Sequence, residues 1–251
     1  MKSFLRSSPL RPLYLWSANR YRQARRLFSY PATARVGVVD YDTYWDNKAP
    51  GMLGQLSAWR RSRAQVFTDI VADGDRVLDL GVGDGALLLY MQERKRIIAH
   101  GLDVSEKAVL FCRAQGLDVD LADINRPIAE FLKGPYDYII CSEIIEHLPD
   151  PESLLNSLRA HVRKGIIISI PNTGFHQHRL RLLFGRFPLQ WVVTPGEHLR
   201  FWTRADFHWW AGQMRFQIVQ EVPYQGTPWL KSLWPSLFAS AFVYVLSDVK
   251  P

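Results

Sequence analysis

The sequence predicts a doubly wound α/β protein with a mostly parallel sheet. From Arg76 onward, short apolar runs alternate with longer amphipathic ones, and the first apolar run leads directly into a glycine-rich segment. An apolar run of about four to eight residues without polar alternation is typical of a strand that is buried on both faces. Parallel sheets need such strands because helices cover both of their faces. With 251 residues, the chain is long enough for one such domain and an appendage.

The elements follow in order along the chain. Four apolar runs predict strands, at residues 76–81, 97–105, 136–143 and 165–172. Amphipathic segments between them predict helices, at residues 84–95, 106–116 and 150–165. The third helix has Asp150 as its N-cap, Pro151 at its first position and Gly165 at its end. The last two apolar runs, 216–224 and 238–247, have no clear helix between them, so we expect them to pair antiparallel at one edge.

The excess positive charge is confined to an N-terminal arm, residues 1–39, that precedes the domain at 40–251. Of 31 lysines and arginines, eight lie in this arm, which contains no acid; the remaining 23 are balanced by 24 acids. A basic amphipathic arm is suited to an anionic membrane, to nucleic acid, or to a mitochondrial transit peptide, and it can also pack over the domain. The nearly neutral domain argues against nucleic acid as the partner. Cys112 and Cys141 lack metal or redox spacing, which favours a reducing, cytoplasmic location.

The glycine-rich segment "DLGVGDGA" contains Asp79, Gly81, Gly83 and Gly85. Glycines at a strand-to-helix turn allow a positive φ and a close approach of the backbone to a ligand. The spacing also satisfies a dinucleotide fingerprint, but an acid two residues before the first glycine favours a cationic ligand over a pyrophosphate. Asp103, at the end of the second strand, is placed to accept both hydroxyls of a ribose.

From about Tyr41 to Ser247 the sequence resembles the class I methyltransferases that use S-adenosylmethionine, in the type 11/12 group. The resemblance implies a Rossmann-like sheet of seven strands. It also implies cofactor contacts from Asp79, Gly81, Gly83, Gly85, Asp103, Val104, Asp123 and Ser142. In this arrangement Asp79 and the glycines hold the methionine part, Asp103 the ribose and Asp123 the adenine amino group.

The stretch "SEIIEHLPDP" places Glu143, Glu146 and His147 within five residues. If a helix begins near Glu143, all three lie on one face at the ligand-binding edge of the sheet. The motif resembles those of ubiquinone-pathway O-methyltransferases and of small-RNA 3′-terminal 2′-O-methyltransferases. The latter resemblance implies a divalent metal, Mg²⁺ or Mn²⁺, held by Glu143, Glu146, His147 and His198. The alternatives are a metal-free role, with His147 as a general base beside Glu143, or a purely structural one.

Residues 172–203 form a long excursion rich in aromatic and basic side chains, which predicts a cap over the acceptor together with residues 41–50. A helix within it is expected to end at Gly185. The excursion also resembles the MetW-type proteins of methionine biosynthesis, which work beside a homoserine acyltransferase. The leading prediction is O-methylation of a small-molecule, saccharide or lipid-precursor acceptor. The alternatives are a MetW-like regulatory partner without catalysis and an RNA 2′-O-methyltransferase.

Overall fold

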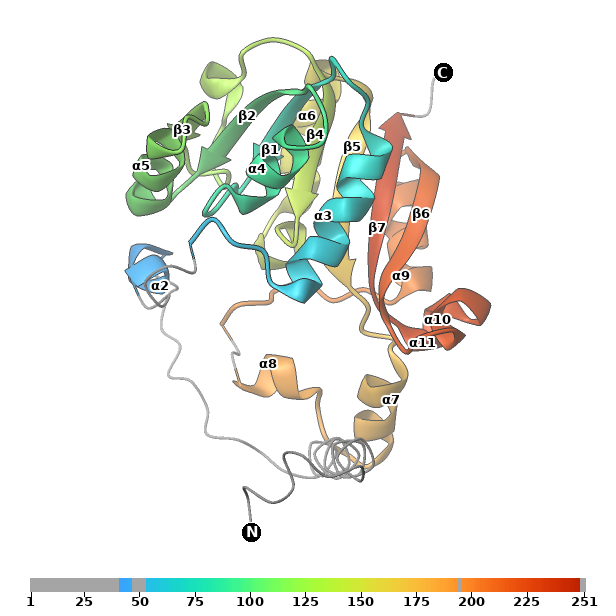
Figure 1. Cartoon of the computed structure of the whole chain (residues 1–251). Coiled ribbons are helices and arrows are strands. Elements are labelled where there is room, and N and C mark those ends of the chain that lie inside the picture. The colour runs from blue at the N-terminus through green and yellow to red at the C-terminus, as the bar shows by residue number, and fades with distance from the viewer. Residues whose placement is uncertain (1–40, 47–52, 194–195, 249–251) are drawn as a thin grey trace, which may run out of the picture.

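The computed structural model describes residues 41–46, 53–193 and 196–248 and confirms the predicted α/β architecture (Figure 1). Its centre is a seven-stranded sheet with the order β3-β2-β1-β4-β5-β7-β6. The strands are β1 (Arg76–Leu80), β2 (Ile98–Asp103), β3 (Val119–Leu121), β4 (Tyr136–Ser142), β5 (Val162–Pro171), β6 (Phe216–Gly226) and β7 (Ala239–Asp248). Strands β1 to β5 pair in parallel, whereas β7 pairs antiparallel with both β5 and β6. The predicted antiparallel edge is therefore confirmed.

Helices cover both faces of this sheet. The α-helices are α2 (Tyr41–Asp46), α3 (Ala58–Ile70), α4 (Ala86–Gln92), α5 (Glu106–Ala114), α6 (Pro151–Leu158), α7 (His176–Leu183), α8 (Leu189–Val193), α9 (Arg204–Gln213), α10 (Leu230–Leu233) and α11 (Pro235–Phe238). Short 3₁₀ turns are η2 (Ala129–Phe131), η3 (Ile145–His147) and η4 (Arg159–His161). Within the described ranges, no helix is both long and apolar enough to cross a bilayer.

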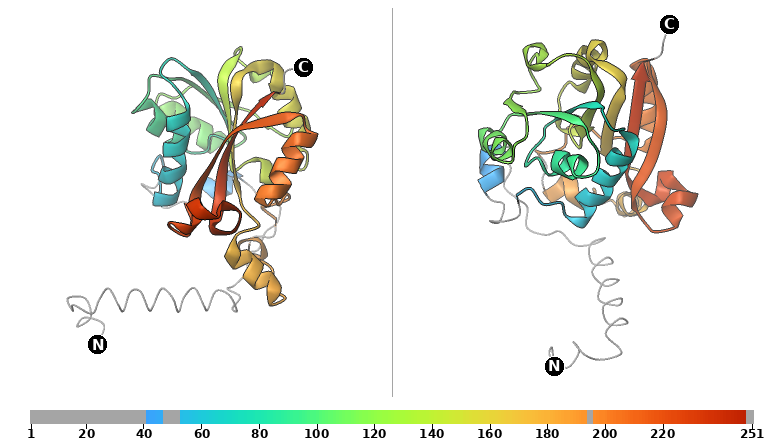
Figure 2. Two further views of the ribbon diagram at one scale, coloured as in Figure 1. Left: turned by 90° about the vertical axis from the view of Figure 1, so that its right-hand side faces the viewer. Right: turned by 45° about the horizontal axis from the view of Figure 1, so that its top comes forward.

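The core has two layers because the central strands are buried on both faces. On one face, α3 and α4 pack through Phe67 and Met91 against Val77 and its neighbours. On the other face, α6 and α9 contribute Leu155 and Phe207 to a second cluster with Leu78, and the Phe207 ring stacks on Tyr244 of β7. Figure 2 shows α3 and α9 on opposite sides of the sheet. Adjacent strand residues thus enter different layers, which explains why the apolar runs lack polar alternation.

Two expectations about the elements are wrong. The helix expected over 150–165 ends at Leu158, and Gly165 lies inside β5. A side chain there would place its Cβ 2.8 Å from the carbonyl oxygen of Leu246, so glycine is needed where β7 approaches closely. In addition, α10 and α11 connect β6 to β7, where no clear helix was expected. The cap helix α7 agrees with prediction, and Gly185 follows it with φ +66°.

The segments that matter for function lie at one edge of the sheet, where the parallel strands have their carboxyl ends. The carboxyl ends of parallel strands meet at the same edge, which is where ligands bind in open α/β sheets. The cap helices α7 and α8 follow β5 at this edge. Because β6 and β5 are both antiparallel to β7, β6 also ends there, and α10 and α11 follow it. The basic arm, residues 1–39, lies outside the described residues.

Candidate active site

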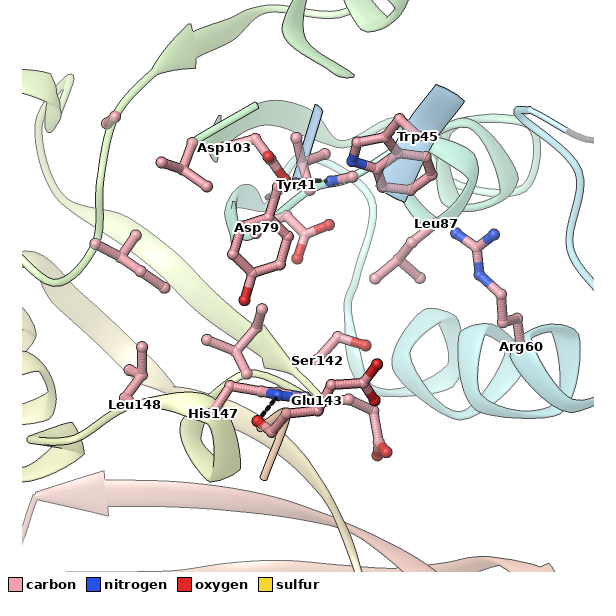
Figure 3. Close-up of a pocket in the computed structure, with 18 of the residues that line it drawn as sticks. Tyr41, Trp45, Arg60, Asp79, Leu87, Asp103, Ser142, Glu143, His147 and Leu148 are labelled. Carbon is pink, nitrogen blue, oxygen red and sulfur yellow. Dashed lines mark hydrogen bonds between the residues drawn. The ribbon is translucent and has the colours of Figure 1, made fainter. Parts of the chain in front are cut away.

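A cavity of about 430 Å³ lies at the carboxyl edge of the sheet (Figure 3). Most of the residues predicted to bind the cofactor line it: Asp79, Gly81, Gly83, Asp103, Val104, Asp123 and Ser142. Glu143, His147 and His198 also line it. The strand ends therefore bring the predicted constellation together around one space of a size suited to a small-molecule ligand.

The glycine turn after β1 forms one wall of the cavity. Gly81 has φ +66°, and a Cβ there would lie 2.3 Å from the Cδ1 of Ile144. Gly83 has φ +58°, and its Cβ would lie 2.9 Å from the ring of Trp45. Gly85 does not line the cavity; it packs instead against Leu117 and Cys112 where α4 begins. Its absent side chain therefore allows the start of α4 to pack closely against α5 and the loop before β3.

Asp79 is a buried carboxylate that faces the cavity without a partner. It is 2% exposed, and its Oδ1 has no hydrogen-bond partner among the described residues. Burial raises the pKa of Asp79 to about 8, with Arg63 opposing the shift and Asp103 adding to it. A buried carboxylate of this kind is complementary to a cation. The ammonium of the methionine part of S-adenosylmethionine fits this requirement.

Asp103 is held in one orientation by the backbone around it. Its Oδ2 accepts a hydrogen bond from the Gly83 amide at 2.7 Å, and its Oδ1 accepts one from the Ser105 amide at 2.9 Å. Each oxygen keeps a further lone pair, so the carboxylate can still accept from two ribose hydroxyls. Burial raises the pKa of Asp103 despite these bonds. The position of Asp103 at the cavity and its remaining hydrogen-bond acceptor sites therefore fit the predicted ribose contact.

Helix α2 contributes two aromatic residues to the cavity that the motif analysis did not assign to the cofactor. Tyr41 and Trp45 lie beside Asp103 (Figure 3). Residues 41–50 were predicted to cover the acceptor. In the described part of that segment, 41–46, Trp45 lies against Gly83 of the glycine turn and Asp42 contacts Ser105, next to Asp103 and Val104. Asp123 also lines the cavity and accepts from the Asn125 amide at 2.9 Å.

The stretch after β4 does not form the expected helix. Glu143 has φ +56°, a left-handed conformation that is uncommon for a residue other than glycine. Its amide donates to the hydroxyl of Ser169 at 3.0 Å, which fixes this turn to β5. A single 3₁₀ turn, η3, follows, and α6 begins only at Pro151. Glu143 and Glu146 therefore do not share a helical face.

Glu143 forms an ion pair that the sequence did not reveal. Its Oε1 lies 3.3 Å from Nη1 of Arg63, on α3, and accepts from the hydroxyl of Tyr224, on β6, at 3.1 Å. The Arg63 guanidinium also lies over the ring of Trp59, at 4.6 Å from its centroid. The sequence separations of 80 and 81 residues explain why no local motif could reveal these contacts. A fixed guanidinium thus already neutralises Glu143.

Glu146 lies beneath the cavity and does not line it. It is 1% exposed, and neither carboxylate oxygen has a hydrogen-bond partner among the described residues. Burial, together with the charge of Glu143, raises the pKa of Glu146 well above its usual range. The side chain is therefore favoured in its neutral, protonated form.

His147 and His198 face each other with opposite hydrogen-bonding roles. The Nδ1 of His147 lies 2.5 Å from the carbonyl oxygen of Glu197, which can only accept, so this Nδ1 carries the hydrogen. In contrast, the indole N–H of Trp191 donates to the Nδ1 of His198 at 3.1 Å. The neutral ring of His147 therefore has its lone pair on Nε2, whereas that of His198 has its hydrogen on Nε2. The ring centroids lie 4.6 Å apart.

Burial keeps His198 neutral. It lowers the pKa of His198 to about 4, and His147 adds to the shift. With a neutral His147 ring, the pair offers one lone pair and one N–H, which together match a hydroxyl group that donates one hydrogen bond and accepts another.

The structure does not bring the four predicted metal ligands together. Among the described residues, no three of Glu143, Glu146, His147 and His198 place donor atoms within 4.8 Å of one another. Glu143 is paired with Arg63, Glu146 lies outside the cavity, and the Nδ1 atoms of both histidines are occupied. The residues present therefore do not fit a divalent metal at this motif.

A different set of residues, His100, Asp118 and Asp120, has suitably close donor atoms in the described part of the chain. The Lys133 ammonium lies 2.6 Å from Asp118 and 2.9 Å from Asp120, and so already supplies the positive charge there.

Comparison with known proteins identifies the family of the chain. The sequence model of the family described as methionine biosynthesis protein MetW matches residues 61–246. The chain is 31% identical over 170 residues to a bifunctional methionine biosynthesis protein MetXA/MetW of Rhodopirellula baltica, covering 61% of this chain but only 27% of that protein. It is 31% identical over 167 residues to a ubiquinone biosynthesis O-methyltransferase of Dechloromonas aromatica, covering 63% of this chain and 71% of that enzyme.

Solved structures support the fold. A SAM-dependent methyltransferase of Archaeoglobus fulgidus is similar with a TM-score of 0.56 and 19% identity, covering 74% of this chain and 92% of that one. At this identity the likeness concerns the fold alone, which matches the seven-stranded sheet described above.

Proposed function

The chain belongs to the MetW family and is a class I methyltransferase dependent on S-adenosylmethionine, and from the geometry of its site we propose that it methylates a hydroxyl group. The observation that carries this proposal is the opposite tautomers of His147 and His198 at the cavity. A hydroxyl acceptor must lose a proton during methyl transfer, and a neutral imidazole with a free Nε2 lone pair can take it. The acceptor we propose is a small molecule, a saccharide or a lipid precursor.

Each residue has one task in the proposed reaction. When bound, S-adenosylmethionine supplies an electrophilic methyl group on a sulfonium sulfur. Asp79 holds the ammonium of the methionine part, and Asp103 accepts from the ribose hydroxyls. His198 donates through Nε2–H to the acceptor oxygen, while His147 removes the proton of that oxygen. As the carbon–oxygen bond forms, the bond between the methyl carbon and sulfur breaks, and S-adenosylhomocysteine leaves. Because the methyl group is already reactive, orientation of the acceptor supplies much of the acceleration.

Arg63 has a positioning role in this scheme. It balances Glu143 at the turn after β4, so the wall of the cavity carries no unpaired carboxylate at that point. Removing one partner of such a buried pair leaves the other charge uncompensated. We propose that Arg63 and Tyr224 together fix Glu143, which in turn fixes the backbone that leads to His147.

This arrangement predicts that the reaction does not need a divalent metal. Exhaustive chelation should leave the turnover number unchanged within about twofold, because the guanidinium of Arg63 already occupies the carboxylate of Glu143. The measurement is the release of S-adenosylhomocysteine before and after EDTA treatment, with and without added Mg²⁺ or Mn²⁺. A loss of turnover that only the added metal restores contradicts the prediction.

The direct test of the proposed function is a screen for release of S-adenosylhomocysteine with hydroxyl-bearing acceptors. Sugars, quinols, lipid precursors and RNA ends should be compared with matched acceptors in which the hydroxyl is replaced by hydrogen. Turnover that requires the hydroxyl supports O-methylation. Turnover on an amine or a carbon acceptor alone contradicts it, and turnover on RNA ends alone supports the RNA alternative.

The family match favours a second candidate function, that of a regulatory partner without its own chemistry. The relative from Rhodopirellula baltica joins MetXA and MetW in one chain. If this chain serves as such a partner, it should stimulate a homoserine acyltransferase, and substitution of His147 should not change that effect. Stimulation that survives the substitution, with no acceptor found, would favour this candidate over O-methylation.

A further inference from the structure

Two surface segments at the carboxyl edge of the sheet carry exposed apolar side chains. The first is the end of α7, where Leu182 and Leu183 are 47% and 77% exposed. The second surrounds α10, where Trp229, Leu233 and Trp234 are 89%, 81% and 58% exposed. Single exposed apolar residues are ordinary on a protein surface, but a cluster of large ones marks an interaction site. We refer to these five residues as the apolar rim.

The two segments are neighbours in the fold. The ring centroids of His176, at the start of α7, and Phe238, at the end of α11, lie 5.3 Å apart. The side-chain amide of Asn172 donates to the carbonyl oxygen of Ser236 at 3.2 Å. Both segments project from the lower end of the molecule in Figure 1 and in the left view of Figure 2. They therefore present the apolar rim at the edge where the cavity lies.

Trp229 carries the clearest sign of a role beyond packing. Its φ is +67°, a left-handed backbone conformation that is strained for a bulky residue. Its indole has nearly full access to solvent, so burial in this chain does not compensate the strain. An indole is amphipathic, with an apolar body and an N–H donor, and tryptophan is enriched where apolar and aqueous phases meet.

The two segments that carry the apolar rim contain basic residues and no acidic ones. Residues 172–196 and 222–247 contain no aspartate or glutamate, and their charged residues are Arg179, Arg186 and Lys231, together with Arg181, which is buried. Residues 1–39 also lack acids and carry eight basic residues. Exposed aromatic and aliphatic side chains among cations are the composition of a surface that lies on anionic lipid.

We propose that the apolar rim is a docking surface for an anionic lipid bilayer. Trp229, Leu233, Trp234 and Leu183 would enter the interface between headgroups and acyl chains. Arg179 and Lys231, which are not buried, would contact the lipid phosphates. A second copy of the chain fits less well, because a two-fold interface brings the same surface, and hence the same cations, together. The inference concerns a binding surface, and its test is independent of any methyl acceptor.

The experiment is co-sedimentation of the full chain with phosphatidylcholine vesicles that contain about one quarter phosphatidylglycerol, against pure phosphatidylcholine. The W229S/L233S/W234S variant should bind the anionic vesicles at least about tenfold more weakly than the unchanged chain. L183S should weaken binding by a smaller factor. The matched control is W209S, because Trp209 is also well exposed, at 67%, but lies on α9 outside both segments.

The outcomes separate the candidate occupants. Weaker vesicle binding by the triple variant, with W209S unchanged, supports the bilayer. Equal binding by both variants overturns the proposal. Dimers by light scattering that the triple variant dissociates overturn it in favour of a second copy. Retained S-adenosylhomocysteine binding by the triple variant shows that its fold is intact.

Discussion

Replacing Asp79 by asparagine is expected to weaken binding of S-adenosylmethionine by about 100-fold while making the ligand-free protein more stable. The loss follows because a charge-assisted hydrogen bond to the ligand's ammonium is replaced by a neutral contact. The gain follows because a buried carboxylate without a partner costs about 1–3 kcal/mol, which the neutral amide avoids in part. Isothermal titration calorimetry measures the affinity, and thermal denaturation of the ligand-free proteins measures the stability.

The stability difference between D79N and the unchanged protein should depend on pH, and this dependence tests whether ionisation of Asp79 causes it. In the unfolded chain the Asp79 carboxyl has its ordinary pKa near 3.8, whereas burial raises the pKa to about 8 in the folded protein. The folded state therefore binds this proton more tightly, and the contribution of Asp79 to stability is lost as the pH rises from about 4 through 8. The stability advantage of D79N should accordingly grow across that window. Binding of the cofactor by the unchanged protein near pH 6.5 should release about one proton, because the carboxyl ionises against the ammonium.

Asp75 provides a matched control for D79N. It is also buried, but it accepts a hydrogen bond from the Ala72 amide and pairs with Lys164. D75N should lower the stability and leave cofactor affinity unchanged. Unchanged cofactor affinity in D79N would contradict the assignment of Asp79 to the ammonium.

Replacing His147 by alanine is expected to lower the turnover number by about 100-fold to 1,000-fold, because a positioned general base contributes that much to a proton transfer. The affinity for S-adenosylmethionine should change little, since the cofactor's predicted contacts come from other residues. The measurement is steady-state release of S-adenosylhomocysteine with the acceptor found in the screen, together with calorimetric binding of the cofactor.

Two further variants test whether His147 acts on a proton or only shapes the cavity. Added imidazole should restore part of the activity of H147A if the missing group is a base, and should not restore it if the ring only fills space. H161A is a control, because His161 lies on η4 and does not line the cavity. A turnover number that H147A leaves intact would falsify the general-base role and favour a regulatory partner.

Structural features that depend on residues close together in the sequence could be predicted from it. Strands β1, β4 and β5 were predicted because burial on both faces favours a continuous run of apolar residues in the centre of each strand. The glycine turn was predicted because a positive φ and a close approach both exclude side chains. Asp79 and Asp103 lie at the ends of adjacent parallel strands, so the order of elements was enough to predict that they line one cavity.

Contacts between distant segments could not be predicted in this way. Arg63 and Tyr224 meet Glu143 only because α3 and β6 pack near the end of β4. The left-handed turn at Glu143 breaks the expected helix, and no glycine marks it in the sequence. The metal site was inferred from the types of residues in one motif, but the turn separates Glu143 from Glu146 and the structure neutralises Glu143 with an arginine. Gly165 was taken for a helix end because its role depends on the approach of β7, which lies about 80 residues further on.

The strand order has a consequence for how the chain is made. Strand β7 lies between β5 and β6 and is synthesised after both, so β5 has an unpaired edge from the time it leaves the ribosome until β7 emerges. That edge carries the sequence "IIISI", and an unpaired apolar edge is prone to pair with another chain. Tyr224 also reaches Glu143 only after β6 is fixed by β7. A nascent chain that stalls before Ala239 therefore exposes an aggregation-prone strand edge and lacks a fixed contact of its active site. The emergence of β7 is thus the step that protects the protein from aggregation.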